Sequence, residues 1–129
     1  MRLNGICLVS DDVRSLRAFY IELLQMQPSG DENWWVDFGV VGDSQLVIYS
    51  EAGMEEMAPG SMSGSGNGRF TIEFEVDDPD AECHRMTVFG APVVKPPTTQ
   101  TWGRRSVWLR DHDGNIVNLY KNVAGAPDA

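Results

Sequence analysis

Aromatic and acidic side chains alternate with aliphatic ones in several short segments of this chain, and such a pattern could serve binding chemistry. The rings could enclose a flat ring system, because stacked aromatic pairs gain about 0.5–1.5 kcal/mol beyond area burial. The carboxylates could meet a cationic group or accept hydrogen bonds from hydroxyls and amides. We expect these residues to contact a ligand: Trp35, Asp37, Val47, Tyr49, Thr71, Glu73, Glu75, Trp102, Trp108, Arg110, Asn118 and Tyr120.

The residue types that most often perform catalysis lie elsewhere. His84 and His112 fall in a predicted helix and in a turn, and we interpret both as surface residues. Cys7 and Cys83 show no metal-type spacing and are interpreted as reduced thiols. No basic partner for Cys7 can be named, which favours a packed thiol over a nucleophile. We therefore assign no catalytic residue, no metal ligand and no cofactor.

Hydrophobic periodicity indicates the elements that position these residues. In the first half, residues 3–10 are a predicted strand, and Asp11 or Asp12 caps the amphipathic helix that follows. Residues 34–40 and 45–50 flank a turn at Gly42-Asp43-Ser44 and predict a hairpin. Residues 51–68 are rich in Gly, Ser and Met, which predicts a flexible connector.

The second half repeats this layout. A predicted strand over residues 70–77 precedes a helix over 79–89, which Gly90 ends. A short strand over 92–95 follows, and Pro96-Pro97 is predicted to begin a loop that runs through Trp102-Gly103. Arg104 and Arg105 are interpreted as bracing this loop. Residues 105–111 and 115–121 then pair across a Gly-containing turn, and the tail from Asn122 is predicted to fray.

The period of two along each strand divides its residues between two faces. We expect the aliphatic face to form the core beneath the helices. It comprises Ile6, Leu8, Val36, Phe38, Leu46, Ile48, Ile72, Phe74, Val76, Val107, Leu109, Val117 and Leu119. The opposite face then carries Gly5, Cys7 and Val9 together with the strand residues expected to contact a ligand.

The repeat, and above all its ending Arg110-Asp111-His112-Asp113-Gly114-Asn115, resembles the vicinal oxygen chelate superfamily, which includes glyoxalases, dioxygenases and bleomycin-resistance proteins. The resemblance implies an α+β fold of two tandem βαβββ modules, which form a cupped mixed sheet with helices on its convex side. We expect a single domain over 1–129, with module one at 1–50, a linker at 51–68, module two at 69–121 and a frayed tail at 122–129. The resemblance also implies a homodimer with shared cavities.

In enzymes of that superfamily a divalent metal is held by the first and last strands of each module. The equivalent positions here are Gly5, Val47, Thr71 and Asn118. None of these side chains is an imidazole or carboxylate, the groups that a catalytic divalent ion prefers. This departure places the chain in the metal-free, bleomycin-resistance-like branch.

Composition excludes several classes of partner. The chain has 129 residues and a formal net charge of −9, which argues against nucleic acid because phosphates would be repelled. No apolar run approaches the roughly 20 residues of a membrane span. We therefore expect a cytoplasmic protein that binds an aromatic small molecule, either cationic or polycyclic, and neither nucleic acid nor a membrane.

Three functions remain open. The first is a metal-free protein that sequesters an aromatic antibiotic or antitumour natural product, as in bleomycin-type drug resistance. The second is a metal-dependent glyoxalase-like or dioxygenase-like enzyme, which needs ligands that the sequence lacks. The third is a metal-free enzyme on the same scaffold, with Glu73 or Glu75 as general base.

Overall fold

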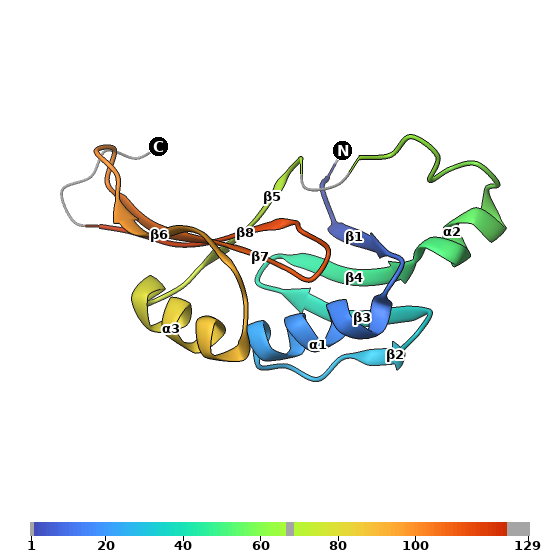
Figure 1. Ribbon diagram of the computed structural model, residues 1–129, viewed down its shortest axis with the longest axis horizontal. Helices are drawn as coiled ribbons and strands as arrows, with labels where there is room; N and C mark the ends of the chain where they lie inside the picture. Colours follow the sequence, from blue (N-terminus) through green and yellow to red (C-terminus); the bar gives the residue numbers. More distant parts are fainter. Residues whose placement is uncertain (1, 67–68, 124–129) are drawn as a thin grey trace. The chain divides into compact units, whose positions relative to one another are not determined.

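The computed structural model describes residues 2–66 and 69–123 (Figure 1). The chain divides into two compact units, Met1–Gly66 and Asn67–Ala129. We call them module one and module two and describe each by itself.

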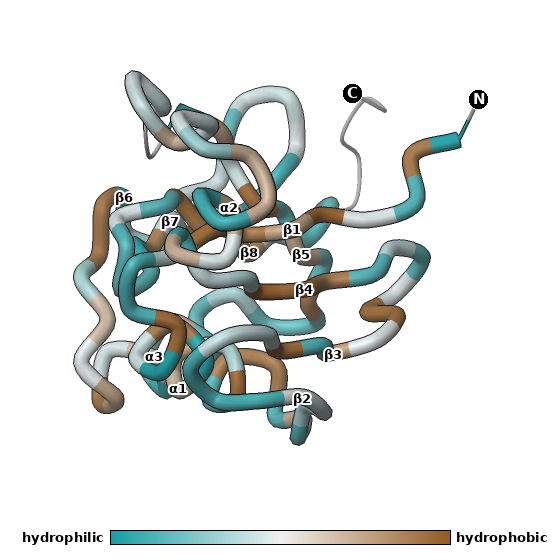
Figure 2. Tube along the Cα trace, turned by 90° about the vertical axis from the view of Figure 1, so that its right-hand side faces the viewer, coloured by the Kyte–Doolittle hydropathy of each residue, from teal (hydrophilic) through white to brown (hydrophobic). Residues whose placement is uncertain are grey.

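Module one contains a four-stranded mixed sheet with the order β1-β4-β3-β2. Its strands are β1 (Gly5–Ser10), β2 (Ser29–Asp31), β3 (Trp35–Val41) and β4 (Ser44–Ser50). The first strand runs parallel to the last, and β2, β3 and β4 form an antiparallel meander. Much of β4 is hydrophobic (Figure 2), as expected for a central strand.

Helix α1 (Val13–Leu24) connects β1 to β2. It begins where the Asp12 carboxylate accepts a hydrogen bond from the Ser15 backbone N–H, at 3.1 Å. The helix contacts β1, β3 and β4 with its apolar face, on which Leu16 and Tyr20 are fully buried. The core of module one therefore lies between α1 and one face of the sheet.

Module two has the same topology. Its strands β5 (Thr71–Glu75), β6 (Val93–Thr99), β7 (Arg104–Arg110) and β8 (Ile116–Asn122) are ordered β5-β8-β7-β6. The strand β5 runs parallel to β8, and helix α3 (Pro79–Phe89) contacts β6, β7 and β8. The predicted α+β fold with repeated βαβββ modules is confirmed.

The predicted core face is confirmed for most of its members, including Leu8, Val36, Ile48, Val107 and Val117. The prediction for Ile6 is wrong, because this side chain is 37% exposed. It lies near the start of β1, an edge strand of its sheet. An edge strand has a neighbour on one side only, so its first residues are poorly covered.

Three predicted element boundaries need correction. The first part of the expected connector forms helix α2 (Glu51–Met57), because the Ser50 hydroxyl accepts a hydrogen bond from the Gly53 N–H and caps the helix. Pro96 and Pro97 lie within β6, where register irregularities accommodate them. Asn122 pairs with Arg104 and extends β8 into the predicted tail.

The sequence did not predict the strand β2. The remaining parts of the predicted linker and tail, residues 67, 68 and 124–129, lie outside the described residues.

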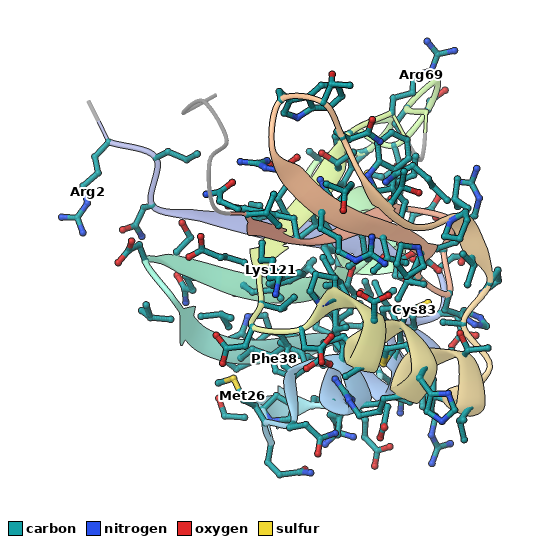
Figure 3. The ribbon with its side chains drawn as sticks, turned by 90° about the vertical axis from the view of Figure 1, so that its left-hand side faces the viewer. Arg2, Met26, Phe38, Arg69, Cys83 and Lys121 are labelled. Carbon is teal, nitrogen blue, oxygen red and sulfur yellow. The ribbon has the colours of Figure 1, made fainter. Side chains whose placement is uncertain are left out.

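No helix among the described residues is long and apolar enough to cross a membrane. The two cysteines are free thiols. Cys7 lies on β1, and Cys83 lies on α3 (Figure 3). Cys7 is exposed, so its prediction as a packed thiol is wrong: it lies on an edge strand, on the face that α1 does not cover. Partial desolvation raises the pKa of this thiol and leaves less of the nucleophilic thiolate at neutral pH.

Candidate functional site

In module one, the predicted ligand-contact residues share one face of the sheet. Val47 lies opposite both Cys7 and Asp37, and Tyr49 lies opposite both Val9 and Trp35. Residues that pair across neighbouring strands project to the same side. The residues that alternate with these along each strand form the core beneath α1. Both rows of predicted ligand-contact residues therefore lie on the sheet face that α1 does not cover.

The carboxylate on this face is held by its own module. The Asp37 Oδ1 atom accepts a hydrogen bond from the Gly39 backbone N–H at 2.7 Å. The Gln45 side-chain amide approaches both Asp37 oxygens, at 3.4 and 3.3 Å. The Asp37 carboxylate therefore already accepts intramolecular hydrogen bonds, and fewer of its lone pairs remain for a ligand.

The two rings of this face are packed against glycines. A Cβ added to Gly30 would lie only 2.7 Å from Cε3 of the Trp35 ring, and one added to Gly53 would lie 2.8 Å from Cζ of Tyr49. Tyr49 also makes an edge contact with Trp34, with ring centres 6.3 Å apart. Trp35 remains 39% exposed, so it retains a surface on which another ring could stack.

Most of the residues predicted to contact a ligand belong to module two, and those on its strands again share one face of the sheet. Glu73 lies opposite Asn118, which lies opposite Trp108 on β7. The next row joins Glu75, Tyr120 and Ser106. The remaining row joins Thr71, Ile116 and Arg110.

Glu73 connects the two residues of module two that occupy the metal-equivalent positions. Its Oε2 atom accepts hydrogen bonds from the Thr71 hydroxyl at 3.4 Å and from the Asn118 amide Nδ2 at 3.1 Å. The Arg104 guanidinium lies 3.9 Å from the other oxygen, Oε1. The carboxylate is thus oriented by three side chains of its own module.

Each ring on this face has a cation of the protein beside it. The guanidinium carbon of Arg104 lies 3.8 Å from the centre of the Tyr120 ring. The Lys95 Nζ lies 5.2 Å from the centre of the Trp108 ring and donates to the Ser106 carbonyl and hydroxyl oxygens, at 3.0 and 2.8 Å. Desolvation, followed by the charge of Arg105, lowers the pKa of Lys95.

Neither cation was predicted to lie here. Arg104 was interpreted as a loop residue, although it has the same parity as Trp108 and Arg110 on β7 and that alternation could have revealed it. Lys95 was assigned to a short strand, with no contact predicted for it. Arg105 contacts the segment that it was predicted to brace, because it donates to the Thr99 hydroxyl at 3.1 Å, and it also forms two hydrogen bonds of 2.7 Å with Asp80 on α3.

Three side-chain atoms on this face are shielded from solvent and have no hydrogen-bond partner within the described residues. They are the Arg104 Nε, the Trp108 Nε1 and the Asn118 Oδ1. Asn118 is only 6% exposed. Because an unpaired buried polar atom costs about 1–3 kcal/mol, a molecule that displaced the groups covering these atoms and supplied the missing partners would recover free energy.

Two members of the predicted set lie at the ends of this surface. Trp102 precedes β7 and is 51% exposed. Arg110 donates to the Gly114 carbonyl oxygen at 2.8 Å, so its guanidinium is bonded to the β7–β8 turn.

The residues present do not fit the divalent metal of the chelate enzymes. Gly5 and Val47 carry no donor atom, and Thr71 and Asn118 are bonded to Glu73. Within residues 2–66 and 69–123 there is no cluster of three or more His, Cys, Asp or Glu that could hold a metal ion. A side chain at Gly5 would also meet the Gln45 backbone oxygen, which lies 2.7 Å from the position of a Cβ.

Module one has a cavity of about 460 Å³ that sequence analysis did not anticipate. It lies where β1 and β4 end, and Trp34 lines it in place of the predicted Trp35. Its lining is Ser10, Asp11, Val13, Asn33, Trp34, Ser50, Glu51, Ala52 and Glu55. The Glu55 carboxylate accepts hydrogen bonds from the backbone N–H groups of Gly60 and Met62, which holds the following turns against α2.

Comparison with known proteins agrees with this architecture. The uncharacterized protein YraH of Bacillus subtilis (strain 168) is 26% identical over 127 residues, which cover 94% of this chain and 98% of that protein. A glyoxalase/bleomycin resistance protein/dioxygenase from Nocardioides has a crystal structure that matches with a TM-score of 0.80 at 20% identity, covering 100% of this chain and 88% of that one. A family enzyme from Burkholderia phytofirmans PsJN matches with a TM-score of 0.83 at 18% identity, covering 95% of this chain and 100% of that one.

The family model described as the Glyoxalase/Bleomycin resistance protein/Dioxygenase superfamily matches residues 2–119. This range includes module one, module two as far as the middle of β8, and the Asp111–Asn115 turn that carries the sequence resemblance. The chain therefore belongs to the glyoxalase/bleomycin resistance protein/dioxygenase superfamily.

Proposed function

We propose that this protein is a metal-free binding protein that sequesters an aromatic natural product, such as an antibiotic or antitumour compound, without making or breaking a bond. One observation carries the proposal: the four positions where chelate enzymes hold their metal are Gly5, Val47, Thr71 and Asn118. Two of these residues have no donor atom, and the other two are bonded to Glu73. In each module, the sheet face that carries these positions also carries rings and polar groups.

The required affinity is within reach of such a surface. A dissociation constant of 1 µM corresponds to about −8.2 kcal/mol. Removing roughly 200 Å² of apolar ligand surface from water contributes about 5 kcal/mol, at about 25 cal/mol per Å². Each stacked ring adds about 0.5–1.5 kcal/mol, and association and desolvation costs consume part of the total. Two stacked rings alone therefore fall short of micromolar binding, and the remainder must come from polar groups of the ligand that pair with this surface.

The test is a titration with a panel of polycyclic and DNA-damaging antibiotics, followed by thermal shift and tryptophan fluorescence. We expect at least one compound to bind at micromolar concentration or below and to quench the fluorescence. A Trp108→Phe variant should lose much of the quenching, whereas Trp34→Phe, which alters the cavity of module one, should retain it. If no compound produces either signal, the proposal is wrong.

The two enzymatic alternatives make different predictions. A metal-dependent lyase or dioxygenase requires a stoichiometric divalent ion in protein purified without chelator, which elemental analysis detects. A metal-free enzyme with Glu73 as base requires that Glu73→Gln retain binding and lose turnover of the bound compound. The contacts of Glu73 with Thr71, Asn118 and Arg104 hold its carboxylate in one position, which both a binding role and a base require, so the variant decides between them.

A further inference from the structure

The two rings on the sheet face of module two already have cations of the protein beside them, so a cationic ligand would meet like charges there. Tyr120 has the Arg104 guanidinium over its ring, and Trp108 has the Lys95 ammonium near its ring. A ligand cation attracted to either ring would come within a few ångströms of a like charge. At 4 Å two unit charges repel by about 4 kcal/mol in the dielectric typical of a protein surface. This exceeds the roughly 0.5–2 kcal/mol of a cation–π contact.

The unpaired atoms on this face indicate what a ligand should carry. The Arg104 Nε and the Trp108 Nε1 are buried donors without acceptors, and the Asn118 Oδ1 is a buried acceptor without a donor. The orientation of the Asn118 amide is fixed, since its Nδ2 donates to Glu73. The complement of this set is a group with acceptor oxygens next to a hydroxyl or N–H donor.

We propose that the ligand of this surface is a hydroxylated aromatic acid. Its carboxylate or phenolate binds beside Lys95 and Arg104, and its hydroxyl donates a hydrogen bond to the Asn118 side-chain oxygen. The proposal rests on the binding function proposed above and specifies its ligand class. Guanidinium planes stack on flat rings and pair with carboxylates, so Arg104 can contribute both interactions.

The dimensions agree with a fused bicyclic ligand. Trp108 and Ser106 are two residues apart on β7, and Ser106 lies opposite Tyr120. Their rows are therefore separated by about 6.6 Å, at roughly 3.3 Å per residue along a strand. A naphthalene-sized ring system spans this distance and can lie across both rows.

The acidic charge of the chain does not prevent this selectivity. The formal net charge is −9, but exposed charges more than about 8 Å away are largely screened at physiological ionic strength. Two carboxylates lie on this face: that of Glu73 is engaged by Arg104, Thr71 and Asn118, and Glu75 lies opposite Tyr120. The charged groups placed against the two rings are the cations Arg104 and Lys95.

The experiment compares three probes of similar size by isothermal titration calorimetry: 3-hydroxy-2-naphthoate, its neutral amide, and the cation 2-naphthylmethylammonium. We expect the acid to bind about tenfold or more tightly than the amide, and the amine to bind most weakly, as for a charge-assisted contact. Arg104→Gln and Lys95→Gln should each weaken the acid about tenfold and the amide less than threefold. Arg104→Lys, which keeps the charge, should retain most of the preference.

The controls separate loss of the site from loss of the fold. Arg14→Gln removes an exposed cation of module one and should leave all three affinities unchanged. Urea midpoints of each variant report whether the fold is retained. Equal or tighter binding of the amine overturns the ligand class and leaves the binding function standing. Failure of all three probes, together with a silent antibiotic panel, overturns both proposals.

Discussion

The ring of Tyr49 packs against Gly53, in the first turns of helix α2. A Cβ at Gly53 would lie 2.8 Å from Cζ of the tyrosine ring and 2.9 Å from the Ser50 hydroxyl that caps the helix. Glycine at this position therefore allows α2 to begin immediately after β4. Tyr49, predicted as a ligand contact, also has this structural role.

Gly53→Ala should destabilise module one, since the added methyl overlaps both the ring and the capping hydroxyl. We expect a loss of about 1–3 kcal/mol, the usual cost of overpacking a buried position. Urea unfolding followed by circular dichroism measures it. Ala52→Ser, at an exposed position of the same helix, should change stability by no more than about 0.5 kcal/mol. Equal effects of the two substitutions would contradict this account.

The ion pair between Asp80 and Arg105 should make stability depend on pH in the acidic range. The hydrogen bonds from Arg105 lower the pKa of Asp80, and those to Asp80 raise the pKa of Arg105. A carboxylate with a depressed pKa contributes stability above its unfolded pKa of about 4 and loses it as pH falls through the folded value. The urea midpoint of Asp80→Asn should therefore fall below that of the wild type at neutral pH, and the two should converge at lower pH. A constant difference down to acidic pH would show that the charge is not responsible.

Asp111 should be essential for the turn between β7 and β8. Its carboxylate accepts hydrogen bonds from the backbone N–H groups of Asp113 and Asn115 and from the Asn115 side-chain amide, each at 2.9 Å. Replacing it with alanine leaves these donors without their acceptor, and a buried unpaired donor costs about 1–3 kcal/mol. Asp43→Ala, at an exposed position of the equivalent hairpin in module one, is the matched control. Thermal denaturation should show a clearly larger decrease in Tm for Asp111→Ala.

Metal removal should leave ligand binding unchanged, because the metal-equivalent residues offer no suitable donor set. Protein purified without chelator should contain less than stoichiometric divalent metal by elemental analysis. After treatment with chelator, its Tm and its Kd for the best aromatic probe should be unaltered. One equivalent of metal per chain, with a lower Tm after its removal, would contradict the metal-free proposal.

Periodicity was sufficient to predict the two modules and the face on which most candidate residues lie. Alternation along β7 and β8 correctly assigned Val107, Leu109, Val117 and Leu119 to the core. Prediction from sequence pattern failed where a local hydrogen bond or strand pairing decides the structure of a segment whose composition suggests a loop. Residues 51–57 have a linker-like sequence, yet the Ser50 cap makes them a helix. Pro96 and Pro97 suggest a loop, yet an edge strand accommodates them.

The contacts within the candidate site were less predictable. Sequence alone assigned Glu73 and Tyr120 to the same face, but not the presence of Arg104 between these two partners. The length of an arginine side chain lets it reach several neighbours, and its position depends on the packing of all of them. The expectation of a cationic ligand, which came from the net charge and from the carboxylates of Asp37, Glu73 and Glu75, stays a prediction. The homodimer and the cytoplasmic location stay predictions.

The prolines of β6 bear on the tendency of the protein to aggregate. The order β5-β8-β7-β6 makes β6 one edge of its sheet, and Pro96 and Pro97 interrupt its row of N–H donors. A foreign strand that approaches this edge cannot form a continuous ladder of hydrogen bonds. Replacing both prolines would create an uninterrupted template for strand addition. The sequence thus protects β6 against amyloid-like association by omitting two of its backbone donors.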